Sequence, residues 1–278
     1  MRDDWSGGGR NGYAQAGDAW AHAADDVVAL ALARADREHR GPVPEVLDVG
    51  TGSGPALLAA ARAGALAVGV DRAADLVRVA AARAAAAGLG GRTRLLVGDA
   101  GALPFPTGRF DVALSTFGVM FAPDPWRSAA ELVRVCRPGG WLAVASWTPD
   151  GVFGRIAPTV ARALPRPPGS VDAPTRWGEP GHVRRWFAPL PVTVETLVCE
   201  VRVTYPSVER AVRVFADKPG PLRQYRTALE AAGRWEVARD ALSELFTAHG
   251  RATDGSLQMH VPYLVALGRV DRGTGKSR

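Results

Sequence analysis

Short apolar runs alternate with longer, alanine-rich stretches along the first half of the chain. The runs have the length of buried strands, and the alanine-rich stretches have the length and periodicity of helices packed on one face. The predicted strands cover residues 46–49, 66–70, 93–97, 110–114 and 141–145. The predicted helices cover residues 55–63, 73–87 and 125–135. This alternation predicts βαβ units and a mostly parallel sheet.

The pattern differs on both sides of this unit. Residues 13–37 predict a helix, in which Tyr13 and Trp20 lie on one face. After residue 146, the predicted elements are helices over 153–164 and 180–187, strands over 192–204 and 256–270, and a helical stretch over 207–250. We therefore divide the chain into a tail and lid helix (1–40), a cofactor-binding core (41–147), a remainder of the same domain (148–270) and a disordered tail (271–278).

The stretch Val46–Pro55 carries the strongest functional signal. Its three alternating glycines permit positive φ angles and let a ligand approach bare backbone. Pro55 suits the first turn of a helix. A dinucleotide fingerprint would place its third glycine where Pro55 stands, so the turn favours a ligand without a pyrophosphate.

Acidic residues follow two further strands. Asp71 ends the second strand, where a carboxylate can accept hydrogen bonds from ribose hydroxyls. Asp99 and Ala100 follow the third strand, where a carboxylate and a backbone N–H can read an adenine ring. Because parallel strands end at one edge of a sheet, these groups are expected to share one site.

Together these segments resemble the class I S-adenosylmethionine-dependent methyltransferases, in particular the branch of ubiquinone/menaquinone-biosynthesis and small-molecule methyltransferases. The resemblance covers residues 46–146, and its motifs are residues 47–54, 70–71, 98–100, 103–105, 110–112 and 134–141. It implies an α/β fold with a Rossmann-like, seven-stranded, mostly parallel sheet. It also implies an N-terminal helical lid, a final antiparallel strand pair and a helical insertion between these last two strands.

The resemblance implies S-adenosyl-L-methionine as the cofactor. The implied cofactor-binding residues are Asp48, Gly50, Thr51, Gly52, Asp71, Arg72, Asp99, Ala100, Thr116 and Phe117. Gly50 and Gly52 would face the methionine part and Asp71 the ribose, while Asp99 and Ala100 would face adenine. Thr116 and Phe117 would lie beside the methyl group.

Two of these assignments stay open. Arg72 would cover adenine with its guanidinium group or remain solvated. Asp48 would orient the turn, reach the cofactor amine through water, or serve only as a structural acid.

The segment Ser115–Gly118 indicates the acceptor by what it lacks. It has no Asp/Asn-Pro-Pro-aromatic signature of enzymes that methylate amino groups of bases or glutamine, no cysteine and no acidic pair for a metal. We therefore expect a small-molecule acceptor and no metal. The expected pocket residues, each of which could instead belong to the core, are Trp20, Met120, Phe121, Trp147 and Phe153.

A general base is needed only if the acceptor proton has a high pKa. The candidates are His22, His182 and Tyr13. His22 lies near the face of the predicted lid helix, and His182 begins a helix in the acceptor region. A solvated or structural role is the alternative for both histidines.

Charge, hydropathy and cysteine content limit the kinds of partner and the cell compartment that the sequence predicts. The net charge of +6 comes mostly from scattered arginines, which argues against a nucleic-acid footprint. No apolar stretch has the length of a membrane span, and the first residues lack a signal peptide's apolar core, so we expect a cytoplasmic protein that does not bind membranes. The two cysteines form no disulfide framework. Monomer and homodimer both remain open, as do a non-methylating reaction such as cyclisation and methylation of RNA.

Overall fold

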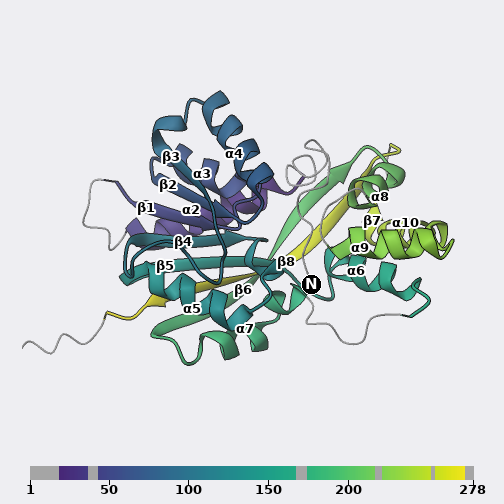
Figure 1. Cartoon of the computed structure of the whole chain (residues 1–278). Coiled ribbons are helices and arrows are strands. Elements are labelled where there is room, and N and C mark those ends of the chain that lie inside the picture. The colour runs from purple at the N-terminus through teal and green to yellow at the C-terminus, as the bar shows by residue number, and fades with distance from the viewer. Residues whose placement is uncertain (1–18, 37–42, 167–173, 217–220, 252–253, 273–278) are drawn as a thin grey trace, which may run out of the picture.

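One mixed sheet runs through the protein in the order β3-β2-β1-β4-β5-β8-β6 (Figure 1). The computed structural model describes residues 19–36, 43–166, 174–216, 221–251 and 254–272. The strands are β1 (Glu45–Val49), β2 (Leu66–Asp71), β3 (Thr93–Val97), β4 (Phe110–Thr116), β5 (Cys136–Trp147), β6 (Val192–Tyr205), β7 (Gly250–Arg251) and β8 (Leu257–Val270). The first five strands pair in parallel, whereas β8 runs antiparallel to both β5 and β6. The predicted Rossmann-like fold is confirmed, with the two-residue β7 added beside β8.

Helices connect the strands, and several of them begin and end at the residues that the sequence marks as helix ends. They are α2 (Ala21–Asp36), α3 (Pro55–Arg62), α4 (Ala74–Ala86), α5 (Pro125–Val135), α6 (Val152–Arg162), α7 (Pro180–Phe187), α8 (Val208–Ala216), α9 (Pro221–Ala231) and α10 (Trp235–His249). The 3-10 helices are η1 (Gly90–Arg92), η2 (Val119–Phe121) and η3 (Pro174–Gly178). Helix α3 starts at Pro55 and is followed by Gly64 at φ 95°, a glycine conformation typical of helix ends. Asp124 caps α5 by accepting a hydrogen bond from the Arg127 N–H at 3.0 Å.

The two strands β6 and β8 extend beyond the rest of the sheet. Strand β8 pairs with β5 only over residues 263–269, but it pairs with β6 along its whole length. The remaining parts of β6 and β8 form a ribbon that extends away from the sheet, with β7 paired to β8 at Gln258 and Met259, and helices α6, α8, α9 and α10 lie beside it (Figure 1). The expected helical insertion between the last two strands is therefore present.

The structure refines two element predictions and tests a third only in part. The stretch 207–250 is not one helix but α8, α9 and α10, and Gly233 at φ 63° follows the end of α9. Strand β5 begins at Cys136 rather than at residue 141, and it accommodates Gly139 at φ 76°. Of the predicted helix 13–37, the structure describes α2, whereas residues 13–18 lie outside the described part.

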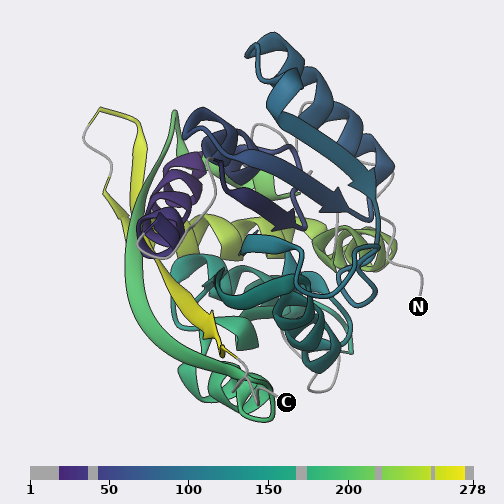
Figure 2. The same ribbon diagram turned by 90° about the vertical axis from the view of Figure 1, so that its left-hand side faces the viewer.

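The central strands are buried on both sides. Leu47 on β1, Leu114 on β4 and Leu142 on β5 are fully buried. Helices α2 and α3 pack together, as do α5 and α7, and both α2 and α5 pack against β4 and β5. Figure 2 shows the same layers from the side, with β6 as the long outer strand. Within the described residues, no helix is both long and apolar enough to cross a membrane.

Candidate functional site

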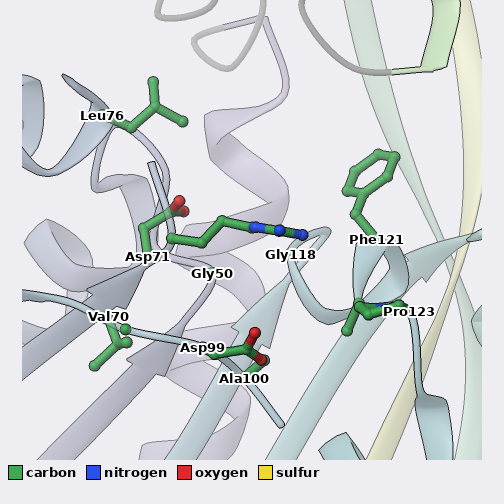
Figure 3. Close-up of a pocket in the computed structure, with 12 residues that line it drawn as sticks. Gly50, Val70, Asp71, Leu76, Asp99, Ala100, Gly118, Phe121 and Pro123 are labelled. Carbon is green, nitrogen blue, oxygen red and sulfur yellow. The ribbon is translucent and has the colours of Figure 1, made fainter. Parts of the chain in front are cut away.

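The loops that follow four parallel strands line a pocket at one edge of the sheet (Figure 3). Its lining residues are Gly50, Val70, Asp71, Arg72, Leu76, Gly98, Asp99, Ala100, Gly118, Phe121, Ala122 and Pro123. Leu76 and Phe121 stand on opposite sides of this pocket, and Asp99 and Ala100 lie together near its base in this view. The pocket thus lies at the carboxyl ends of the strands, where ligands bind in open α/β sheets.

The turn after β1 brings bare backbone to the pocket. Gly50, Gly52 and Gly54 have φ angles of 70°, 56° and 89°, which L side chains rarely adopt. A Cβ atom on Gly50 would lie 2.7 Å from the Cα of Gly118, in the loop after β4. The two loops therefore touch through their main chains, and this close approach requires glycine on both sides.

Asp48 ties this turn to the helix that follows it. Its Oδ2 accepts hydrogen bonds from the Thr51 hydroxyl at 2.7 Å and from the Leu57 N–H at 3.1 Å. The side chain is 1% exposed, and burial raises the pKa of the carboxyl to about 6. Its Oδ1 has no hydrogen-bond partner among the described residues. Asp48 and Thr51 hold the shape of the turn from behind the pocket wall.

Asp71 lies in the pocket wall and supports the same turn. Its Oδ2 accepts a hydrogen bond from the Gly52 N–H, and its Oδ1 accepts one from the Ala73 N–H, both at 2.8 Å. Burial raises the pKa of this carboxyl above its ordinary value. A carboxylate offers about four acceptor sites, so lone pairs remain for hydroxyl donors such as those of a ribose.

The loop after β3 carries the second pocket acid. Asp99 is exposed toward solvent, and its Oδ1 accepts a hydrogen bond from the Gly101 N–H at 2.7 Å. Ala100 lines the pocket beside it, and Arg72 lines the wall that Asp71 supports. Gly50 and these four predicted residues therefore meet in one place. The other five predicted cofactor residues are not among the lining residues: Asp48, Thr51, Gly52, Thr116 and Phe117.

The end of β4 is held in an unusual conformation. Phe117 has a φ of 57°, in the left-handed region that is uncommon for a residue other than glycine. Its ring stacks on Trp147 with the centroids 3.7 Å apart and the planes 9° from parallel. Ser115 supports this bend, because its hydroxyl donates to the Val49 C=O at 2.7 Å and accepts from the Val119 N–H at 3.0 Å.

Three of the five expected acceptor residues form a buried aromatic cluster, in which Trp147 also stacks on Phe117 next to the pocket. The Trp20 ring packs edge-on against Trp147 at 5.6 Å and Phe153 at 5.4 Å between centroids. Trp147 and Phe153 are themselves 4.9 Å apart. Met120 is also buried, whereas Phe121 is half-buried and lines the pocket. Of the five expected residues, only Phe121 is therefore part of the described pocket wall.

The two candidate histidines that the structure describes lie on different helices, α2 and α7. His22 on α2 has a side chain that is 86% exposed, and its Nδ1 is 4.0 Å from the Asp25 carboxylate. His182 on α7 packs against the Trp186 ring at 5.8 Å between centroids. Neither histidine lines the described pocket, and Tyr13 lies outside the described residues.

Several residues that line the pocket were not predicted from the sequence. Leu76 lies in the first turn of α4, and Gly118, Ala122 and Pro123 lie between β4 and α5. The Gly-x-x-x-Ala-Pro spacing after β4 marks a chain that must pass close to a neighbour and then enter a helix. The sequence alone does not show which segment this loop contacts, so the pattern could be interpreted only once the contact with Gly50 was known.

The described residues fit S-adenosylmethionine. A Cβ on Gly50 would collide with the main chain at Gly118, so glycine is needed for the two loops to close this side of the pocket, and Gly50 presents bare backbone to it. Asp71 and Asp99 provide acceptors for hydroxyl and amino donors, and Leu76 and Phe121 provide apolar surface. A site with two acids and an apolar rim suits a cationic nucleoside better than a pyrophosphate.

Comparisons with known proteins agree with this geometry. A family model described as a methyltransferase domain matches residues 47–144. The uncharacterized protein Rv1403c of Mycobacterium tuberculosis is 45% identical over 144 residues, which are 51% of this chain and 51% of that protein. This chain therefore spans about half the length of that curated relative.

Two further comparisons extend over most of the chain. Nocamycin O-methyltransferase of Saccharothrix syringae is 32% identical over 248 residues, which cover 82% of this chain and 86% of that protein. The solved structure of the YcgJ protein from Bacillus subtilis superposes with a TM-score of 0.55 at 16% identity and covers 89% of this chain and 99% of that one. At this level of identity, the second likeness shows the fold alone.

Proposed function

Because the chain belongs to the class I S-adenosylmethionine-dependent methyltransferases, we propose that it transfers a methyl group from S-adenosylmethionine to an oxygen, nitrogen or carbon nucleophile of a small molecule. The observation that carries this proposal is the pocket in which Gly50, Asp71 and Asp99 meet at the ends of three parallel strands. Nocamycin O-methyltransferase is named for methylation at oxygen, which supports an oxygen nucleophile among the three.

The residues of the chain mainly bind and orient. The cofactor, when bound, supplies a methyl group that is already activated on a sulfonium sulfur. Asp71 would accept hydrogen bonds from the ribose, and Asp99 would accept one from the adenine amino group. The backbone at Gly50 and Gly52 would hold the methionine part. Orientation of two reacting groups in this way can contribute ~7–11 kcal/mol to catalysis.

The aromatic cluster would form the acceptor side. Phe117 and Trp147 stack at the ends of β4 and β5, next to the pocket wall at Gly118. Trp20 and Phe153 extend this apolar surface toward α2 and α6. Such a surface would exclude water from the acceptor and would favour a planar or apolar molecule. If the acceptor proton requires a base, His22, His182 and Tyr13 stay our candidates.

The test is transfer of isotopically labelled methyl groups from S-adenosylmethionine to separate fractions of small molecules, RNA and protein. We expect label in the small-molecule fraction, together with an equal amount of S-adenosylhomocysteine. Asp71→Ala should abolish transfer, whereas Asp75→Ala, which changes a partly exposed acid on α4, should leave it intact. Label confined to RNA or protein would refute the acceptor class, and turnover without S-adenosylhomocysteine would favour a non-methylating reaction.

A further inference from the structure

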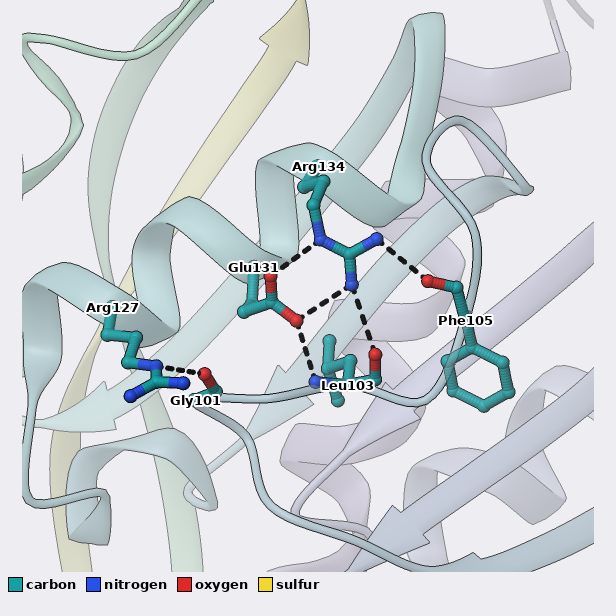
Figure 4. A network of polar contacts seen from close by, with 6 residues as sticks. All are labelled: Gly101, Leu103, Phe105, Arg127, Glu131 and Arg134. Atoms are coloured by element: carbon teal, nitrogen blue, oxygen red, sulfur yellow. Dashed lines mark hydrogen bonds and ion pairs between the residues drawn. The ribbon is translucent and has the colours of Figure 1, made fainter.

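Helix α5 holds the pocket loop that carries Asp99 and Ala100 (Figure 4). This loop, residues 98–109, connects β3 to β4 without a helix of its own. Its described internal backbone bonds include Ala102 N–H to Asp99 C=O at 3.0 Å and Phe105 N–H to Leu103 C=O at 2.8 Å. Side chains of α5 supply further partners for its main chain.

A bidentate ion pair on α5 binds the middle of the loop. The Arg134 Nε and Nη2 donate to the Glu131 carboxylate at 2.6 and 2.8 Å. The same carboxylate accepts from the Leu103 N–H at 2.6 Å, and the guanidinium donates to the Leu103 C=O at 3.1 Å and the Phe105 C=O at 2.7 Å. The Glu131 side chain is only 15% exposed, and the Arg134 guanidinium holds its pKa below the ordinary value. The pair therefore stays charged and fixed.

Arg127 binds the loop closer to the pocket. Its Nε donates a hydrogen bond to the C=O of Gly101, and the N–H of Gly101 donates to Oδ1 of Asp99 at 2.7 Å. Two hydrogen bonds therefore connect α5 to the acid in the pocket wall. Arg127, Glu131 and Arg134 are spaced four and three residues apart, so they share one face of the helix.

The same helix is also continuous with the opposite wall. Ala122 and Pro123 line the pocket directly before Asp124 caps α5. The position of α5 thus sets the separation between this wall and the loop at Asp99. A shift of the loop relative to α5 would change the width of the pocket where adenine is read.

We propose that Arg127, together with the Glu131–Arg134 pair, is a positioning residue that sets the distance and direction of Asp99 and so determines how strictly the pocket recognises the adenine amino group. This inference rests on the proposed binding of S-adenosylmethionine. None of the three side chains lines the pocket, so they act through the loop and not by contact with the ligand.

The experiment measures calorimetric binding of S-adenosylhomocysteine and of S-inosylhomocysteine, in which an oxo group replaces the adenine amino group. Wild-type protein should prefer the adenine compound, because a carboxylate at Asp99 accepts from an amino group. Arg127→Ala should reduce this preference about fivefold to tenfold, in line with the loss of one solvent-exposed charge-assisted hydrogen bond. Arg127→Lys, which keeps a donor, should restore part of it.

A matched control comes from α10, where Arg239 and Glu236 form a pair with the same spacing as Arg134 and Glu131. Arg239→Ala should leave both affinities unchanged. If Arg127→Ala keeps the wild-type ratio of the two affinities, the inference is wrong even when both bind less tightly. If wild-type protein binds neither compound, the proposed function itself fails.

Discussion

Gly118 offers a direct test of how closely two loops must approach to form the pocket. Its φ and ψ angles are −100° and −63°, a conformation that alanine adopts without strain. A Cβ atom there would nevertheless lie 2.7 Å from the Gly50 C=O oxygen and 2.8 Å from the Val49 C=O oxygen. Because the colliding atoms are all backbone, no side-chain rotation can relieve the contact in Gly118→Ala.

The magnitude follows from the size of this overlap. Inserting a methyl group into a tightly packed site typically costs about 1–3 kcal/mol. Relief requires the turn at Gly50 to move away from the loop after β4, and Gly50 lines the pocket. We therefore expect at least a tenfold loss of affinity for S-adenosylhomocysteine, equivalent to about 1.4 kcal/mol. The midpoint of thermal unfolding should fall by about 2–4 °C per kcal/mol lost.

The assay pairs calorimetric binding with thermal unfolding of the ligand-free protein. Gly181→Ala is the control, because no heavy atom lies within 4 Å of a Cβ at that position on α7. This second variant should bind normally and unfold no earlier than wild type. If Gly118→Ala binds within twofold of wild type, the contact between the two loops does not shape the cofactor site, and the reasoning fails.

Three further predictions concern buried groups. Burial raises the pKa of Asp48 from 3.8 to about 6, so its contribution to stability is present below about pH 4 and is lost as pH rises through 6. In urea unfolding at several pH values, Asp48→Asn should reduce this loss of unfolding free energy by up to about 3 kcal/mol, and an unchanged pH dependence would contradict the prediction. Iodoacetamide at pH 8 should modify half-buried Cys199 in native protein and spare buried Cys136, whose pKa is raised to about 12, which peptide mass spectrometry would check. Phe117→Ala and Phe117→Gly both lose the stack on Trp147, but glycine tolerates the positive φ, so the free energy of unfolding in urea should be about 1 kcal/mol higher for the glycine variant. The reverse order would show that this backbone conformation stores no strain.

Local signals predicted the elements of the nucleotide-binding half well. The apolar run at 46–49, the alternating glycines after it and Pro55 each act within a few residues, so strand, turn and helix start are all visible in the sequence. Asp71 and Asp99 could be placed in one site because parallel strands end at one edge. Gly118 could not be placed in the wall, because its role depends on a neighbour across the sheet.

The proposed acceptor half was less predictable for a physical reason. A buried tryptophan in a core and one in a pocket have the same sequence signature, and Trp20, Trp147 and Phe153 form a packed cluster in the described structure. Likewise, Arg127 looks like a solvated helix charge, since its partner is a main-chain group of a distant loop. Glu131 and Arg134 look like an ordinary pair on one helix, and nothing in the sequence shows that they also bind the main chain of that loop. Side chains whose partners are backbone atoms leave no complementary residue type to search for.

The ribbon formed by the ends of β6 and β8 keeps the helices packed on it apart from the glycine turn after β1. Val201 and Val203 on β6 are buried, whereas the alternating residues Glu200 and Arg202 are exposed, so the ribbon offers one apolar side on which helices can pack. We expect that replacing the helices packed there would change the proposed acceptor side and leave the glycine turn after β1 untouched. The proposed acceptor side and the donor site could therefore be varied independently of each other.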